Sequence, residues 1–162
     1  MRKLLSLLLL FVLIALTACG QSYTYCELTL PLPGEYKGEA SDMFDAVYSD
    51  GYATVSVTRI TFSAAFTDGI PDTYSPLQLA RFYQLNNSHD GIEINADSHV
   101  PRYSYTGSTG DGEIYVMHTF YRSPYAYFIV TYTCDAQLFA KYEADFIRYA
   151  DGAYFSDYKP NS

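Results

Sequence analysis

The alternation of apolar and polar residues predicts short β-strands along most of the chain. The first run of alternating residues stops at Pro31 and Gly34, as expected where a strand gives way to a turn. Asp50-Gly51 separates two further runs and favours a tight hairpin turn between them. The predicted strands are residues 26–30, 44–48, 52–62, 91–95, 101–106, 113–121 and 125–134.

Two segments carry the caps and the spacing of helices. Ser75 is followed by Pro76 and Gln78, which is the pattern of a capping box with proline in the first turn. Asp135 is placed to cap a last helix that ends at Gly152. One side of that helix is apolar and consists of Leu138, Phe139, Tyr142, Phe146 and Tyr149. Together the elements predict an α+β fold, a mostly antiparallel β-sheet packed with a few helices.

The N-terminal apolar run is predicted to be a signal peptide. It follows Arg2 and Lys3 and covers residues 4–16, which as a helix would span about 20 Å, less than the roughly 30 Å of a bilayer core. The run ends in LTAC, which resembles the lipobox of bacterial lipoproteins. In that motif the cysteine receives a diacylglyceryl group and becomes the mature N-terminus, so we expect Cys19 to be lipidated. The alternative is a conventional signal peptide with an incidental cysteine near its cleavage site.

This interpretation divides the chain into residues 1–18 as signal peptide, 19–25 as lipidated cysteine and tether, and 26–158 as a single α+β domain. Residues 21–25 reach about 17 Å when extended, so the domain would lie close to the bilayer. Two or three acyl chains hold a protein firmly at a membrane. The expected location is therefore the extracytoplasmic face of the cell membrane.

Charge excludes one class of partner. The formal net charge is −8, and loss of residues 1–18, which hold two basic and no acidic side chains, would leave −10. Nucleic-acid binding needs basic patches, so no nucleic-acid partner is expected. The 18 tyrosines and 10 phenylalanines supply aromatic area for a core and for sheet surfaces.

The order of the predicted elements resembles the PsbP-like α/β/α sandwich family. The stretches that carry the resemblance are LTLPLPGEY, VYSDGYATVSVTRITF, SPLQLARFYQ, EIYVMHTFYRSPYAYFIVTYTC and LFAKYEADFIRYADGAYF. The resemblance implies the PsbP-like sandwich as the fold. It contains no diagnostic motif, so no functional residue is carried over.

Cys26 and Cys134 each fall in phase with apolar neighbours in a predicted strand. Outside the cytoplasm they could form a disulfide, which would close a loop of about 109 residues and contribute about 4 to 5 kcal/mol. Two separate buried thiols fit the pattern equally well. In both cases the expected role is structural.

Six tyrosines cluster on consecutive predicted strands, and their spacing suggests that one sheet face carries several of them. Such rings either stabilise the sheet through cross-strand pairs or form an exposed surface that binds a glycan or a protein. The six are Tyr103, Tyr105, Tyr115, Tyr121, Tyr125 and Tyr127.

No local motif for catalysis or metal binding occurs in the sequence. The histidines at 89, 99 and 118 lack zinc-ligand spacing, and His118 falls in phase with apolar residues, as an interior histidine would. Asp90, Glu93 and Asp97 lack EF-hand spacing and are expected to form a solvated loop. We therefore expect no cofactor and no metal.

The sequence thus predicts a membrane-anchored lipoprotein whose domain is a non-catalytic binding or accessory module for an envelope protein or glycan. The alternative is a hydrolase acting on cell-envelope material, because the members of a catalytic triad can be distant in sequence.

Overall fold

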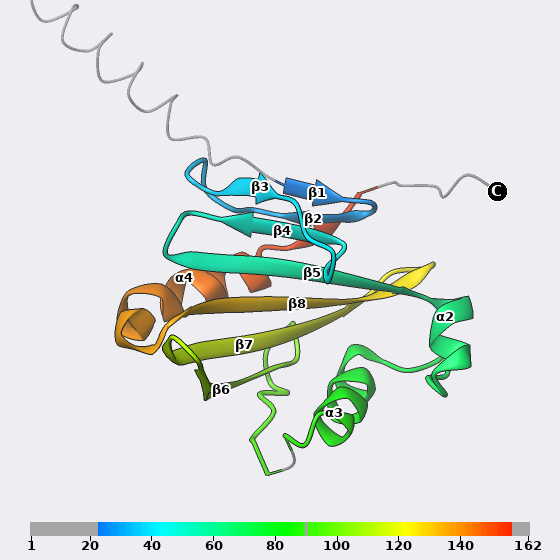
Figure 1. Cartoon of the computed structure of the whole chain (residues 1–162). Coiled ribbons are helices and arrows are strands. Elements are labelled where there is room, and N and C mark those ends of the chain that lie inside the picture. The colour runs from blue at the N-terminus through cyan, green and yellow to red at the C-terminus, as the bar shows by residue number, and fades with distance from the viewer. Residues whose placement is uncertain (1–22, 90, 157–162) are drawn as a thin grey trace, which may run out of the picture.

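The computed structural model describes residues 23–89 and 91–156, which form two antiparallel β-sheets with helices on both faces of the larger sheet (Figure 1). The strands are β1 (Tyr23–Tyr25), β2 (Leu28–Leu30), β3 (Lys37–Glu39), β4 (Ala46–Ser49), β5 (Ala53–Thr61), β6 (Arg102–Thr109), β7 (Gly112–Arg122), β8 (Ala126–Asp135) and β9 (Tyr154–Phe155). The helices are α2 (Phe62–Thr67), α3 (Pro76–Asn86) and α4 (Phe139–Asp151), with a 3₁₀ turn, η1 (Ala136–Leu138), before α4. The α+β class and the antiparallel sheet predicted from the sequence are confirmed.

The larger sheet has the strand order β3-β4-β5-β8-β7-β6, and every neighbouring pair is antiparallel. The long strands β5, β7 and β8 form its centre, while β3 and β6 form its two edges. The smaller sheet, β1-β2-β9, lies over the β3–β5 end and joins the N-terminal hairpin to the segment after α4 (Figure 1).

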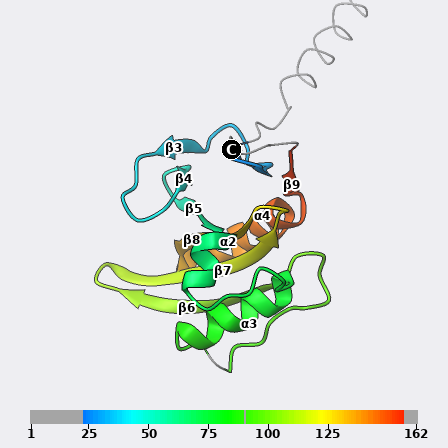
Figure 2. The same cartoon turned by 90° about the vertical axis from the view of Figure 1, so that its right-hand side faces the viewer.

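Helix α4 covers one face of the larger sheet, and α2 and α3 lie on the other. Figure 2 shows β6 and β7 between α4 and α3. The strand alternation explains this arrangement, because successive side chains of β7 point to opposite faces. Tyr115 and Met117 lie in the core on the α4 side, whereas Phe120 lies in the core on the α3 side.

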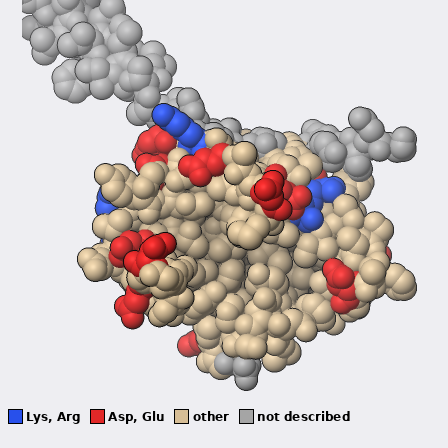
Figure 3. Space-filling view, viewed as in Figure 1, with Lys and Arg blue, Asp and Glu red and all other residues tan. Residues whose placement is uncertain are grey.

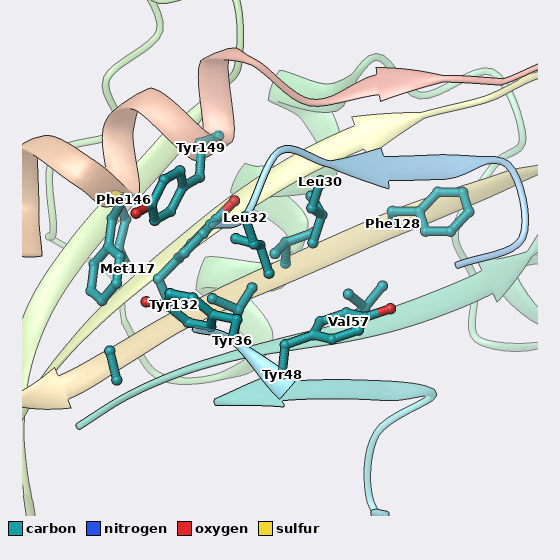
Figure 4. Close-up of a cluster of buried hydrophobic side chains, with 14 of the residues drawn as sticks. Leu30, Leu32, Tyr36, Tyr48, Val57, Met117, Phe128, Tyr132, Phe146 and Tyr149 are labelled. Carbon is teal, nitrogen blue, oxygen red and sulfur yellow. The ribbon is translucent and has the colours of Figure 1, made fainter. Parts of the chain in front are cut away.

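The main core fills the space between the larger sheet, α4 and the smaller sheet. Figure 4 shows this core, in which Leu30 and Leu32 from the N-terminal hairpin meet Phe128 and Tyr132 of β8 and Phe146 of α4. Leu32, Phe128, Tyr132 and Phe146 are fully buried. The apolar side predicted for the last helix is confirmed, because the buried residues of α4 are Tyr142, Phe146, Tyr149 and Ala150.

One predicted turn and one predicted helix cap are confirmed in atomic detail. Between β4 and β5 the Asp50 carboxylate accepts hydrogen bonds from the backbone N–H groups of Tyr52 (2.8 Å) and Ala53 (2.7 Å). Gly51 adopts φ +91°, a conformation that glycine tolerates without strain. At the start of α3, the Ser75 hydroxyl accepts from Gln78 N–H and the Gln78 side chain accepts from Ser75 N–H, which is the predicted capping box.

The structure differs from the sequence prediction in several segments, and the short strands β3 and β9 were not predicted. Residues 91–95 form no strand but a loop with a single bridge between Asn95 and Arg102. Residues 62–67 form α2 rather than the end of a strand, because the Thr61 hydroxyl caps the Ala64 N–H at 3.3 Å. Residues 23–25, assigned to the tether, pair with β2 as strand β1.

The signal peptide and Cys19 lie outside the described residues. Within residues 23–89 and 91–156, no helix combines the length and the apolar character needed to cross a bilayer.

Candidate functional site

The six predicted tyrosines do not form one surface. Tyr115 and Tyr121 face the α4 side of the sheet, whereas Tyr103 and Tyr127 belong to the core on the α3 side. All four are buried, Tyr105 is half-buried, and Tyr125 in the β7–β8 turn is 39% exposed. The interpretation of these rings as an exposed binding surface is therefore wrong for most of them, because each face of the sheet is covered where these rings lie.

The buried tyrosines anchor segments that are distant in sequence. The Tyr121 hydroxyl donates to the carbonyl of Ala150 at 3.0 Å and so fixes the end of α4 against β7. Burial raises the pKa of Tyr121 to about 12, which keeps the hydroxyl protonated and able to donate. The Tyr115 ring lies 4.1 Å from the Phe139 ring, centroid to centroid, at the start of the same helix.

The structure does not bring Cys26 and Cys134 together, and both are free thiols. The position of Cys26 along the sheet follows from its neighbour Glu27, which forms an ion pair with Arg59 of β5. Arg59 lies opposite Phe128 of β8. Cys134 lies six residues further along β8, which corresponds to about 20 Å. A disulfide needs the two Cα atoms within about 7 Å, so the structure supports the alternative of two separate thiols. Cys134 is buried, but Cys26 is only half-buried, because it lies in the β1–β2 turn with φ +51°.

His118 is the interior residue that its phase predicted. Its Nδ1 lies 2.9 Å from the Thr131 hydroxyl, and its Nε2 has no hydrogen-bond partner among the described residues. Burial, and to a smaller extent the nearby His89, lower the pKa of His118 to about 4, so the ring is neutral at pH 7. His89 lies within 3.1 Å of the Tyr103 hydroxyl through Nδ1.

The two histidine rings lack the hydrogen bonds of a catalytic triad. In the described part of the chain neither His118 nor His89 bonds to a carboxylate that would orient it as a general base. No group of three or more His, Cys, Asp or Glu residues that could hold a metal occurs among residues 23–89 and 91–156. Asp90, one of the three acidic residues of the expected solvated loop, lies outside the described residues.

The sequence analysis missed a half-open pocket of about 630 Å³ beside α2, here called the α2 pocket. This volume lies within the range of small-ligand sites. The lining is mostly apolar and consists of Phe62, Ser63, Phe66, Gly69, Ile70, Pro71 and Asp72. Phe66 is 82% exposed at the rim. The sequence does contain a signal for α2. Thr61 can cap a helix, and Phe62, Phe66 and Ile70 follow at the four-residue spacing of one helix face.

Local backbone geometry forms the pocket. Helix α2 ends at Thr67, and two residues later Gly69 reverses the chain with a φ of +76°. The N–H of Ile70 then donates to the Ala65 carbonyl at 2.8 Å, which returns Ile70 beneath the helix. A Cβ atom added at Gly69 would meet no atom within 4 Å, so there is room for a side chain. The positive φ is therefore the reason that this position favours glycine.

Side chains of the sheet hold the far wall of the pocket in place. The Tyr127 hydroxyl donates to the Pro71 carbonyl at 2.6 Å, and the Phe62 ring packs edge-on against the Tyr127 ring at 5.2 Å. The Arg122 guanidinium lies 5.3 Å from the centre of the Phe62 ring and donates through Nη2 to the Asp72 carbonyl at 2.9 Å. Tyr127, one of the six tyrosines considered either as sheet-stabilising or as part of a binding surface, thus supports this pocket.

The rest of the α3-side face carries little charge. Helix α3 packs on β7 and α2 packs on β5, while the half-buried Thr54, Thr58, Thr131 and Thr133 lie on the open part of the sheet. Figure 3 shows this face, with the charged side chains mostly around its margin. An apolar or uncharged polar ligand group suits such a face better than an anion does.

Comparison with solved structures shows similarity of fold at low sequence identity. The solution structure of cyanobacterial PsbP (CyanoP) from Synechocystis sp. PCC 6803 matches with a TM-score of 0.57 and 14% identity, over 86% of this chain and 94% of that one. A crystal structure from Bacteroides thetaiotaomicron VPI-5482 matches with a TM-score of 0.58 and 8% identity, over 86% of this chain and 49% of that one, so this chain spans about half of it.

A third similar structure is LpqN, which is involved in cell envelope biogenesis of Mycobacterium tuberculosis. It has a TM-score of 0.49 and 10% identity, over 85% of each chain. No protein-family model and no curated protein sequence matches the chain. Identities this low bear on the fold alone. The architecture and the match to cyanobacterial PsbP together show that the chain has the PsbP-like fold.

Proposed function

We propose that this protein is a lipid-anchored lipoprotein of the extracytoplasmic membrane face whose domain is a non-catalytic binding module. The α2 pocket supports the binding role, because it is mostly apolar, half-open and rimmed by the exposed Phe66. The lipobox that ends at Cys19 supports the lipid anchor. Strand β1 begins at Tyr23, so only the few residues between Cys19 and Tyr23 separate the anchor from the domain.

The chemistry of the pocket defines the expected partner. An aliphatic or aromatic side chain of an envelope protein would fill the space between Phe62, Phe66 and Ile70. Asp72 lines the same pocket, and the whole chain carries a formal charge of −8. A basic residue beside the inserted side chain would therefore strengthen binding and speed association.

The anchor is tested by replacing Cys19 with Ala. We expect the wild-type chain to fractionate with membranes and to incorporate labelled palmitate, and the variant to do neither. A Cys19→Ala chain that stays in the membrane fraction as fully as the wild type would contradict the lipid anchor.

The pocket is tested with a photo-crosslinking residue placed at position 66 in intact cells. Leu85 offers a matched control, because it is 68% exposed and lies on α3, away from the pocket lining. We expect a discrete crosslinked product from position 66 and none from position 85, and loss of that product when Phe62 is replaced by Asp. Equal yields at positions 66 and 85 would contradict the assignment of the pocket.

A further inference from the structure

Two histidines that are distant in the sequence lie next to each other on the α3 side of the larger sheet. His118 belongs to β7, and His89 follows the end of α3. Their ring centres are 6.0 Å apart, and their ring planes differ by 22°. These two residues, here called the histidine pair, are not part of the lining of the α2 pocket.

Both rings of the histidine pair use the same nitrogen for a hydrogen bond. Nδ1 of His118 lies 2.9 Å from the Thr131 hydroxyl, and Nδ1 of His89 lies 3.1 Å from the Tyr103 hydroxyl. Neither Nε2 has a hydrogen-bond partner among residues 23–89 and 91–156. A histidine that binds a metal is commonly held in this way, with one ring nitrogen fixed by a hydrogen bond and the other free for the ion.

The free nitrogen of His118 is unusual because it is buried. The residue is 6% exposed, and its Nε2 has no partner in the described part of the chain. Buried polar atoms without a partner are rare and costly, so this atom points to a group that binds there. Burial lowers the pKa of His118 to about 4 and so keeps the imidazole in the neutral form, which is the form that binds metals.

The distance between the two rings fits a shared metal ion. An ion bound at about 2.0 Å from an imidazole nitrogen lies about 3.2 Å from the centre of that ring. Two rings bound to one ion are then about 5.2 Å apart at a tetrahedral angle and about 6.4 Å apart in line. The observed 6.0 Å falls between these limits.

Aromatic side chains surround the histidine pair. The rings of Tyr83 and Tyr103 lie 5.3 Å and 5.2 Å from the His118 ring, and the Tyr105 ring lies 4.4 Å from the His89 ring. Such an apolar shell limits the access of water and holds the imidazoles in place. His89 and Tyr105 are only half-buried, so an ion can reach the pair from their side.

We propose that His89 and His118 bind one zinc or copper(II) ion through their Nε2 atoms, with water in the remaining coordination positions. Imidazole nitrogen suits these late first-row metals, whereas calcium and magnesium prefer oxygen ligands. A site with two protein ligands leaves coordination positions open to exchange. The sequence analysis expected no metal because the histidines lack zinc-ligand spacing, and the contact between His89 and His118 arises only when α3 packs on β7.

Metal titration of the purified full-length chain, without an affinity tag and after removal of metals with EDTA, tests the site. We expect calorimetry to show one zinc ion bound per chain and no binding of calcium. His89→Phe and His118→Phe should each weaken zinc binding at least tenfold. His99→Phe is the matched control, because His99 is an exposed histidine outside the pair, and it should bind zinc like the wild type.

The melting temperature of each variant in EDTA shows whether it is folded. His89 is half-buried, so His89→Phe provides the test if His118→Phe does not fold. The lipid anchor and the α2 pocket do not enter these measurements, so their failure would leave the result for the histidine pair intact. Absence of zinc and copper binding, or equal affinity of the wild type and His89→Phe, would overturn the proposal.

Electron paramagnetic resonance of the copper(II)-loaded chain provides a second measurement. We expect the signal of two imidazole nitrogens in the wild type and of one in His89→Phe. Thr131→Val and Tyr103→Phe keep both ligands but remove the hydroxyls that orient them, so each should weaken binding about tenfold. The same number of nitrogen ligands in the wild type and in His89→Phe would show that copper binds elsewhere and would contradict the site.

Discussion

At the scale of single residues, His118 shows how a polar group is accommodated inside this fold. The ring packs at 5.2 Å from Tyr103 and 5.3 Å from Tyr83, and only Thr131 offers it a hydrogen bond among the described residues. Because the surroundings disfavour the charged form, the pKa falls to about 4, below the value of about 6.5 of an exposed histidine. The folded state therefore binds fewer protons than the unfolded state between these two values.

This difference predicts a pH-dependent stability. The contribution of neutral His118 is fully present above pH 6.5 and is lost as the pH falls toward 4, amounting to about 2 kcal/mol between pH 7 and pH 5. We expect urea denaturation of the wild type to show this loss, and His118→Phe, which keeps a ring but cannot titrate, to lose about 2 kcal/mol less. Parallel pH profiles of the two proteins would contradict the assignment.

At the scale of elements, Glu27 fastens the N-terminal hairpin to the larger sheet. Its buried carboxylate accepts a hydrogen bond from the Ser123 hydroxyl at 2.7 Å and lies 3.4 Å from Nε of Arg59. The Glu27 carbonyl also accepts from the N–H of Ser156 at 2.8 Å. One turn residue thus ties β2 to β5, to the β7–β8 turn and to the segment after β9.

Removing only the cation should be costly, because it leaves a buried charge without its partner. We expect Arg59→Met to lower the free energy of unfolding by about 3 kcal/mol. Adding Glu27→Gln to Arg59→Met should recover more than 1 kcal/mol of that loss, because no charge then remains buried. Denaturant titration of the two single variants and the double variant measures the coupling. Strictly additive losses would show that the two side chains do not interact.

At the scale of the whole molecule, packing rather than a disulfide between Cys26 and Cys134 holds residues 23–89 and 91–156 together. The core on the α4 side joins the N-terminal hairpin, the central strands and the last helix, and the aromatic contacts within it span segments far apart in sequence. One example is the edge-on contact between Tyr36 and Tyr149, with ring centres 6.1 Å apart. Cys26 and Cys134 are not needed to close this arrangement.

A reducing agent should consequently leave the melting temperature unchanged. A bridge between these cysteines would contribute about 4 to 5 kcal/mol through a loop of about 109 residues, and its reduction would lower the melting temperature by more than 10 °C. Calorimetry with and without dithiothreitol measures the difference. In the denatured protein, thiol titration should find both Cys26 and Cys134 reactive. A large drop on reduction would contradict the free thiols.

Local signals in the sequence determined the longer elements of this protein, although not α2 or the short strands β1, β3 and β9. Asp50-Gly51 specified its turn, Ser75 and Gln78 specified a helix start, and alternation along β7 and β8 specified strands, because each of these depends on a few adjacent residues. The fold class followed from their order. The lipobox is equally local, so the prediction for Cys19 was made without any structure.

Only the tertiary structure decided what covers each strand face. The alternation of side chains already places Tyr115 and Tyr127 on opposite faces of the sheet. Whether a face meets water or a helix, however, depends on elements distant in sequence. The same reason explains why the distance between Cys26 and Cys134 and the α2 pocket were not predicted. Each is a relation between segments that meet only after the sheet has assembled.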